Sequence, residues 1–211
     1  MALWTRNCTF VPFGPETDPL FKHQILKQIN PYNKPVSSDS CVRTIPYSKI
    51  KPALLEDAQK GGAKLMEAFC AGMWGGYGYA IQRRLMRLSK DDSNREDLWE
   101  KADIVKSTFE PGTYFTNHFV VLSKSPRSVT LRGCFSPRQF PPGPQDVDTV
   151  CELTIVLDDK KRTATLALNS ITFNGTKEAS EAPDPFGGVA GWLHRQYAKL
   201  LVESGADNCT Q

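Results

Sequence analysis

The chain has 211 residues, of which 40% are hydrophobic and 23% charged, the composition of an ordinary globular protein. Its 26 basic and 23 acidic residues give a formal charge of +3, and no run of five basic residues occurs. This balance lacks the broad positive surface of a nucleic-acid-binding protein, so we expect no nucleic-acid partner. A chain of this length buries roughly 70% of the surface that its unfolded form exposes, so it needs no disulfide or metal for stability.

The N-terminal sequence lacks the basic segment and the following apolar segment of a secretory signal. No part of the chain approaches the roughly eighteen consecutive apolar residues of a spanning helix. We therefore expect no membrane insertion and a cytoplasmic location. In that reducing compartment, cysteines without Cys-x-x-Cys spacing are predicted to be small buried hydrophobic residues. They are Cys8, Cys41, Cys70, Cys134, Cys151 and Cys209.

The N-terminal region, residues 1–38, contains five prolines and one short apolar-periodic segment at residues 20–29. This pattern predicts a proline-rich arm with a single short helix. Residues 39–211 are predicted to form one domain that the arm wraps, beginning with a strand over residues 41–47.

Helical spacing of apolar residues follows over residues 52–73, and Gly61 and Gly62 are expected to break or kink that helix. A second helical segment follows Gly75-Gly76 and extends through Leu88. The charged segment 90–100 is predicted to be a solvated loop or helix face.

The periodicity then changes from helical to alternating, which predicts antiparallel strands over residues 114–122, 128–135, 150–157 and 163–173. The last two are expected to form a hairpin. The proline-rich residues 136–144 are a candidate lid over one end of the sheet.

A final helix is predicted over residues 187–204, because four apolar residues share one stripe there, with Trp192 beside it. The stripe contains Val189, Leu193, Tyr197 and Leu200. Such a stripe needs a broad apolar partner, and the concave face of the sheet supplies one.

Three segments resemble the START-like superfamily, which includes polyketide cyclases: Tyr114-Phe-Thr-Asn-His-Phe-Val-Val-Leu, Ser128-Val-Thr-Leu-Arg-Gly-Cys-Phe-Ser-Pro-Arg and Gly191-Trp-Leu-His-Arg-Gln-Tyr-Ala-Lys-Leu. The resemblance covers the last half of the chain. It implies an α+β helix-grip fold, in which a curved antiparallel sheet surrounds a long C-terminal helix and encloses an apolar cavity. A fold alone does not imply an activity.

Several kinds of site have no motif in the sequence. The segment Met73-Trp-Gly-Gly-Tyr-Gly-Tyr lacks Gly-x-Gly-x-x-Gly spacing, and no Gly-Lys-Ser/Thr is present to hold a phosphate. The three histidines, His23, His118 and His194, have no metal-ligand spacing. We therefore expect neither a metal nor another cofactor.

Two titratable residues on predicted strands are candidates for acid/base catalysis. His118 is the natural general base if it faces the cavity, because its ordinary pKa lies near working pH. Glu152 would be a second acid or base if it also faces inward. The alternatives are an exposed or structurally bonded His118 and a solvated Glu152 on the outer face. His194 is expected at the surface, near the cavity mouth.

Substrate-binding residues are expected among the aromatic side chains and one arginine. If Arg132 points inward, it could bind an enolate or carboxylate with two hydrogen bonds. The alternation of its strand favours the outer face of the sheet for this side chain. The aromatic candidates serve either as a pocket wall or as ordinary core. They are Trp74, Tyr77, Tyr79, Tyr114, Phe135 and Trp192.

These features favour a cofactor-independent enzyme acting on a small hydrophobic metabolite, such as a cyclase, isomerase or dehydratase of a polyketide- or terpenoid-like substrate. It would hold one reactive conformer and supply one acid/base group. The alternative is a non-catalytic carrier of a hydrophobic ligand, and a third class is an interaction domain with no cavity. A homodimer is compatible with each of them.

Overall fold

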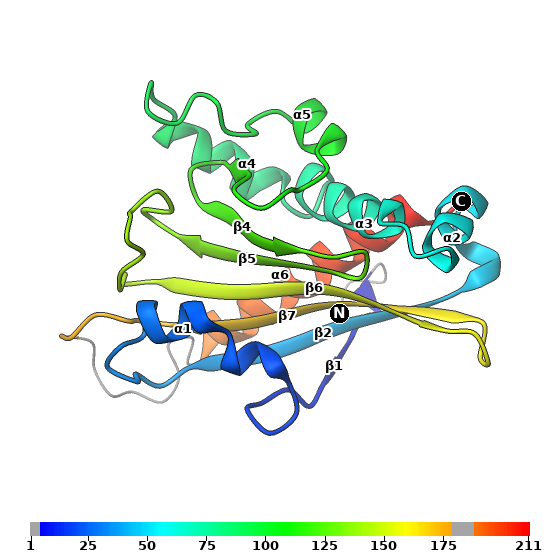
Figure 1. Ribbon diagram of the computed structural model, residues 1–211, viewed down its shortest axis with the longest axis horizontal. Helices are drawn as coiled ribbons and strands as arrows, with labels where there is room; N and C mark the ends of the chain where they lie inside the picture. The colour runs from blue at the N-terminus through cyan, green and yellow to red at the C-terminus, as the bar shows by residue number, and fades with distance from the viewer. Residues whose placement is uncertain (1–4, 179–187) are drawn as a thin grey trace.

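One curved, open antiparallel sheet organises the computed structural model, which describes residues 5–178 and 188–211 (Figure 1). Within these residues seven strands lie in the order β1-β2-β7-β6-β5-β4-β3. The strands are β1 (Thr9–Val11), β2 (Ser37–Pro46), β3 (Tyr114–Phe115), β4 (Phe119–Lys124), β5 (Ser128–Cys134), β6 (Asp148–Asp158) and β7 (Thr163–Phe173). The protein is therefore α+β, as expected.

The β6–β7 hairpin is confirmed, with register from Asp148↔Phe173 to Asp158↔Thr163. Alternating side chains from these strands give the sheet two apolar faces. Cys151, Leu153 and Ile155 belong to the main core that packs under the helices.

The single strand predicted over residues 114–122 is wrong. Thr116 and Asn117 have positive φ angles of 56° and 49°, so the chain turns between β3 and β4. His118 follows this turn and does not lie within a strand. Strict alternation therefore cannot assign its direction, because the turn resets which face each side chain meets.

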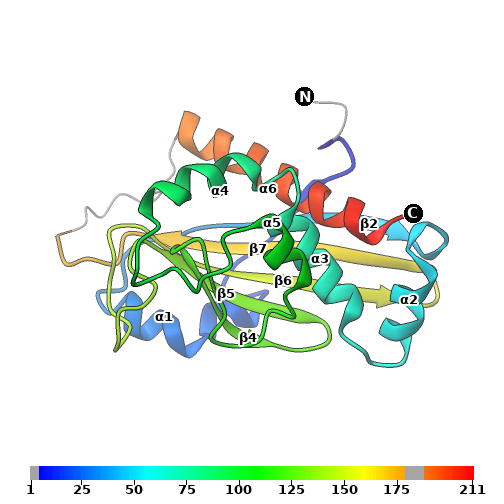
Figure 2. The same ribbon diagram turned by 90° about the horizontal axis from the view of Figure 1, so that it is seen from above.

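The helices lie mainly on one side of the sheet (Figure 2). Those on this side are α2 (Pro52–Gln59), α3 (Lys64–Gly75), α4 (Ala80–Met86), α5 (Lys101–Lys106) and α6 (Val189–Cys209). The predicted break between the first two is confirmed, because Gly61 has a φ of 85°, which favours glycine. Helix α6 packs on α3, β2 and β7.

The stripe predicted for the C-terminal helix is wrong at its N-terminal end, where Val189 and Leu193 are 75% and 55% exposed. The helix itself begins at Val189; residue 187, included in the prediction, lies outside the described residues. The face that packs on the core consists of small and medium side chains, namely Ala198, Leu201, Val202, Gly205, Ala206 and Cys209. Small residues carry little hydrophobic signal, but they allow α6 to approach α3 closely.

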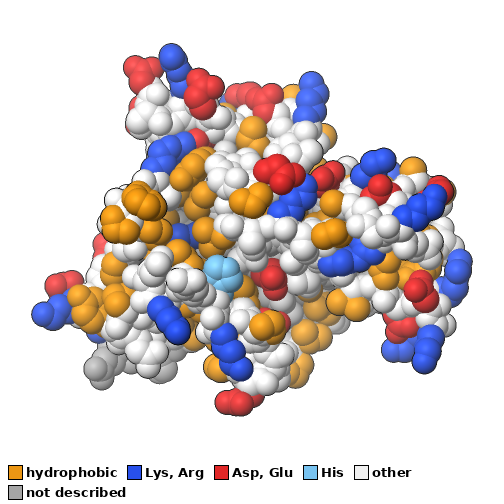
Figure 3. All heavy atoms as spheres, in the orientation of Figure 1, with side chains coloured by type: hydrophobic (Ala, Val, Ile, Leu, Met, Phe, Trp, Pro, Cys, Tyr) orange, Lys and Arg blue, Asp and Glu red, His pale blue; other side chains and the backbone are white. Residues whose placement is uncertain are grey.

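The N-terminal arm covers the opposite face of the sheet. After β1 it forms a short 3₁₀ helix, η2 (Pro19–Lys22), and then α1 (Gln24–Ile29). Ile25 and Ile29 pack on Val150, Ile171 and Phe173 in a second apolar cluster. The sheet is thus covered on both faces. On the side that carries the arm, acidic and basic side chains are interspersed (Figure 3).

The charged segment 90–100 is a largely exposed loop that buries one aromatic and two polar side chains. Trp99 is 1% exposed, and its indole Nε1 donates to the Asn94 carbonyl at 2.9 Å. Asn94 and Asp97 are buried as well. The charged side chains of the segment are otherwise mostly exposed, as expected, and the buried Asp97 accepts from the Asn117 amide at 2.8 Å.

All six cysteines are buried and unpaired, which confirms their expected packing role. Among the described residues, no helix is long and apolar enough to cross a membrane.

Candidate functional site

A pocket of about 220 Å³ lies between the helix-covered face of the sheet and the N-terminal half of α6. It is smaller than the roughly 300–1,000 Å³ of typical ligand pockets, so it suits a compact ligand. Its lining comes from the sheet, from α3 and α4, and from α6. The lining residues are Trp74, Gln82, His118, Phe119, Val147, Thr149, Cys151, Leu168, Ser170, Thr172, His194, Tyr197, Ala198 and Leu201.

The pocket floor consists of two neighbouring rows of the sheet. Cys151 pairs with Ser170 across β6 and β7, and Thr149 pairs with Thr172. The hydroxyls of Thr149 and Thr172 lie 3.0 Å apart in a hydrogen bond. Short polar side chains at these positions leave space that larger apolar residues would fill.

Aromatic rings form one wall of the pocket. The Trp74 and Phe119 ring centroids are 4.7 Å apart. Gly133 makes room for Phe119, because a Cβ at this glycine would lie 2.6 Å from the ring. The Trp74 indole Nε1 is buried and has no hydrogen-bond partner among the described residues. A buried donor without a partner is costly.

His118 enters the pocket from the turn before β4 and makes an edge-to-face contact with Phe119, with ring centroids 4.6 Å apart. Burial lowers the pKa of His118 to about 4, although a backbone hydrogen bond with Cys134 opposes this shift. The imidazole is therefore neutral at neutral pH. The inward position supports the expectation for His118, but such a low pKa makes it a weak base.

His194 lines the same pocket from α6 and belongs to a polar network. Its Nε2 lies 3.2 Å from the carboxylate Oδ2 of Asp39 on β2. The Ser170 hydroxyl donates to the other Asp39 oxygen at 2.9 Å. The register explains this assembly, because Asp39 pairs directly with Ser170. A carboxylate in this position orients an imidazole.

A further polar contact closes the helical side of the pocket. The Tyr197 hydroxyl donates to Gln82 Oε1 at 2.7 Å, which joins α6 to α4. Burial raises the pKa of Tyr197, so its hydroxyl keeps its proton and acts as a donor.

The predicted acid/base residue Glu152 and the predicted ligand residue Arg132 both lie on the other face of the sheet. The half-buried Glu152 accepts from the Thr130 hydroxyl at 3.3 Å, and burial raises the pKa of its carboxyl. Arg132 is 1% exposed and binds Asp148 through Nε and Nη2, at 2.9 and 2.6 Å. Neither side chain lines the pocket.

Arg132 instead fastens the β5–β6 loop, since its Nη2 also donates to the Gly143 carbonyl at 2.7 Å. Burial alone would lower the pKa of Arg132, but Asp148 more than offsets this, so the pKa is raised. Of this loop, the predicted lid at residues 136–144 contributes nothing to the pocket lining, whereas Val147 does.

The six aromatic candidates for substrate binding lie in different parts of the structure. Trp74 alone among them lines the pocket. Tyr79 is buried and its hydroxyl lies 2.6 Å from that of Thr116, while Tyr77 donates to Asp207 at 2.8 Å. Tyr114 stacks under the Arg138 guanidinium. The last two candidates, Phe135 and Trp192, are 63% and 60% exposed.

Sequence reasoning missed Asp39 and underestimated His194. Asp39 stood at the predicted boundary between arm and domain, where no periodicity marks it. A signal for His194 existed, because it precedes Ala198 by four residues and Leu201 by seven and so continues the observed buried stripe. The stripe went unrecognised because larger apolar residues nearby suggested another face.

No group of three or more His, Cys, Asp or Glu side chains within the described residues could hold a metal ion. Comparison with protein-family models, with curated proteins and with solved structures finds no match to this chain. The START-like relationship therefore stays a prediction, and the pocket geometry is the basis for any functional proposal.

Proposed function

We propose that the protein is a cofactor-independent enzyme that moves a proton on a small hydrophobic metabolite, as a cyclase, isomerase or dehydratase does. We also propose that the sheet and the C-terminal helix form a helix-grip fold. The observation that carries it is the presence of two histidines, in different environments, at one small pocket with otherwise largely apolar walls. Two titratable groups in different environments at one site are typical of acid/base chemistry.

The two histidines are proposed to have different roles. His194, with Asp39 beside its Nε2 at 3.2 Å, exchanges the proton, because the carboxylate stabilises the imidazolium that forms. His118 positions the ligand: burial keeps its imidazole uncharged, the Cys134 backbone holds its one N–H, and its other ring nitrogen can accept from a ligand hydroxyl. This assignment changes the expected role of His118 from general base to positioning group, and His194 replaces Glu152 as the second titratable residue.

The pocket walls supply the second half of the proposed mechanism. A ligand packed against Trp74 and Leu201 would lose most of its rotational freedom before the proton moves. Fixing one reactive conformer lowers the barrier without any cofactor.

A simple ketone tests this proposal without knowledge of the natural substrate. 2-Tetralone is compact and apolar, and its α-protons exchange with D₂O when a base removes one and the enolate takes a deuteron from solvent. We expect the protein to accelerate this exchange, as followed by proton NMR. His194→Gln should slow the catalysed exchange about 10²- to 10⁴-fold. His118→Gln should slow it by no more than about tenfold, because it alters one hydrogen bond to the enol hydroxyl and leaves the base in place.

His23→Asn is the matched control, because His23 lies on the arm, where its Nδ1 accepts from the Ile25 amide, and Asn also caps helices well. The control should exchange 2-tetralone at the wild-type rate. Binding of 2-tetralone in the pocket without accelerated exchange would refute the catalytic proposal and favour the carrier. Equal loss in all three variants would refute the assigned roles.

A further inference from the structure

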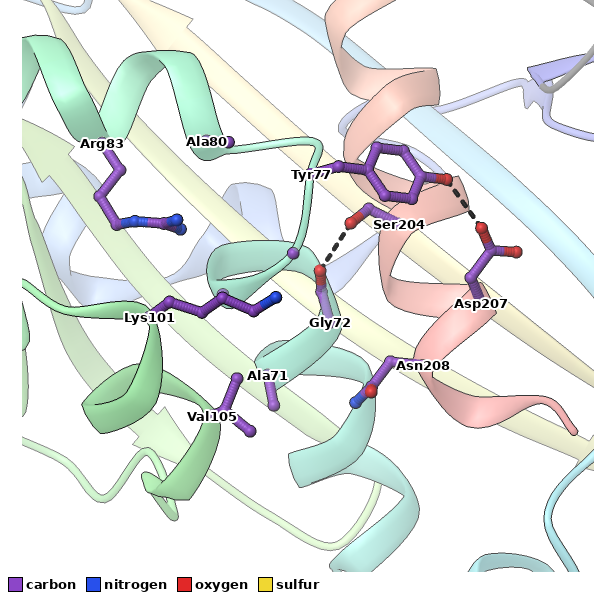
Figure 4. A pocket seen from close by; sticks show the side chains of 12 residues that line it. Ala71, Gly72, Tyr77, Ala80, Arg83, Lys101, Val105, Ser204, Asp207 and Asn208 are labelled. Atoms are coloured by element: carbon purple, nitrogen blue, oxygen red, sulfur yellow. Dashed lines mark hydrogen bonds between the residues drawn. The ribbon is translucent and has the colours of Figure 1, made fainter.

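A second pocket, separate from the one that holds the histidines, lies among α3, α4, α5 and α6 and has a volume of about 410 Å³ (Figure 4). It is built around the glycine-rich segment that links α3 to α4. Its lining consists of Ala71, Gly72, Gly75, Gly76, Tyr77, Ala80, Arg83, Lys101, Val105, Ser204, Asp207 and Asn208.

The glycines determine how this pocket is formed. A Cβ at Gly72 would lie 2.4 Å from Asn208 Cβ, and one at Gly76 would lie 2.2 Å from Ser204 Oγ. These glycines therefore allow α3 to lie directly on α6, where Ser204 Oγ donates to the Gly72 carbonyl at 2.7 Å. The close approach leaves the side chains of α4 and α5 to line a hollow beside the crossing.

Two basic side chains, from α4 and α5, extend into this hollow (Figure 4). Arg83 Nη1 donates to the Trp74 carbonyl at 3.0 Å, which leaves most of its guanidinium donors for another partner. Lys101 has no hydrogen-bond or ion-pair partner among the described residues. Burial lowers the pKa of Arg83, and a bound anion would offset that loss of hydration.

The other walls of the pocket are apolar or already hydrogen-bonded. Ala71, Ala80 and Val105 provide apolar contact surface. On the α6 side, the acidic lining residue Asp207 accepts a hydrogen bond from the Tyr77 hydroxyl at its Oδ2, over 2.8 Å (Figure 4). Asn208 is held by its own bond to the Ala68 carbonyl at 2.8 Å. The basic groups thus face a hollow in which the described acidic group is already engaged.

We infer that this pocket binds a small molecule that carries a carboxylate or phosphate group on a compact apolar body. Arg83 and Lys101 would hold the anionic group, because a planar guanidinium and an ammonium both donate charge-assisted hydrogen bonds to such oxygens. The apolar body would lie on Ala80 and Val105. The site does not depend on the proposed enzymatic function.

Binding of three probes by isothermal titration calorimetry tests the inference. Benzoate and phenyl phosphate carry the two possible anionic groups, and benzyl alcohol is an uncharged analogue. We expect saturable binding of at least one anion, with one molecule per chain, and much weaker binding of the alcohol. The tighter anion identifies which of the two groups the site prefers.

Variants locate the site. Lys101→Gln and Arg83→Gln should each weaken anion binding about tenfold or more, the usual effect of losing one charge-assisted hydrogen bond. Arg84→Gln and Lys106→Gln, which each remove one positive charge from the same two helices outside the pocket, should stay within about twofold of the wild type. If Arg83→Gln does not fold, Lys101→Gln decides, because Lys101 has no partner among the described residues to lose.

Three outcomes would overturn the inference: no saturable anion binding, equal affinity for benzyl alcohol, or equal loss in the pocket and control variants. Binding of 2-tetralone to Lys101→Gln should match the wild type, so that a failure here is distinct from a failure of the proposed enzyme.

Discussion

Both faces of the sheet bury polar side chains, but one face encloses them in an ion pair and the other leaves a pocket beside them. On the arm face, Arg132 and Asp148 bind each other and leave no space between them. On the helix face, His118 and His194 line a pocket whose floor carries short hydroxyl side chains. A buried titratable residue in this sheet therefore marks a candidate site only where the covering layer leaves room beside it.

The largest effect is expected on the arm face. Arg132→Met leaves the fully buried Asp148 carboxylate without its cation, and should lower the free energy of unfolding by about 3–5 kcal/mol. Urea denaturation at neutral pH measures the change. The double variant Arg132→Met/Asp148→Leu should be more stable than Arg132→Met alone, because it removes the unpaired charge. A loss below about 1 kcal/mol in the single variant would show that water reaches this pair.

The next effect concerns the pocket face and depends on pH. The pKa of His118 is lowered from 6.5 to about 4 in the folded protein, so between these values the unfolded chain binds a proton that the folded chain does not. Stability should therefore fall as pH drops from about 6.5 to about 4, by on the order of 3 kcal/mol from this residue. His118→Gln should remove that component, as urea denaturation at pH 7 and pH 4.5 would reveal. An unchanged pH dependence would mean that His118 is solvated.

The smallest pair of effects distinguishes the two stripes of α6. Leu201 is 5% exposed and Leu193 is 55% exposed. Leu201→Ala should cost about 2–3 kcal/mol, near the lower end for buried leucines because the site already borders a pocket. Leu193→Ala should change stability by less than about 0.5 kcal/mol. If thermal or urea unfolding shows a larger stability loss for Leu193→Ala than for Leu201→Ala, the stripe predicted from the sequence is the buried one.

The sequence predicts the elements better than it predicts their burial. Strands β5, β6 and β7 follow from alternation, because both faces of a paired strand repeat every two residues. The turn at Thr116 and Asn117 does not follow, since two non-glycine residues adopt positive φ there.

The candidate site was only partly predictable for a related reason. His118 was found because its residue type suits proton chemistry, whereas Asp39 and Ser170 meet only through the pairing of β2 with β7, 131 residues apart. Such long-range register is set by the whole sheet and not by any local pattern. The alternation of β5 predicts which face of the sheet carries Arg132. Its burial could not be predicted, because it depends on the N-terminal arm covering that face, and no local pattern reveals the position of the arm.

The central claim, that His118 and His194 face one ligand pocket, has a direct test because the chain contains three histidines. Imidazole resonances are followed by NMR while 2-tetralone is added. We expect the signals of His118 and His194 to shift together with a single dissociation constant, while that of His23, on the arm, stays constant. A shift confined to one of the two pocket histidines, or an equal shift of His23, would contradict it.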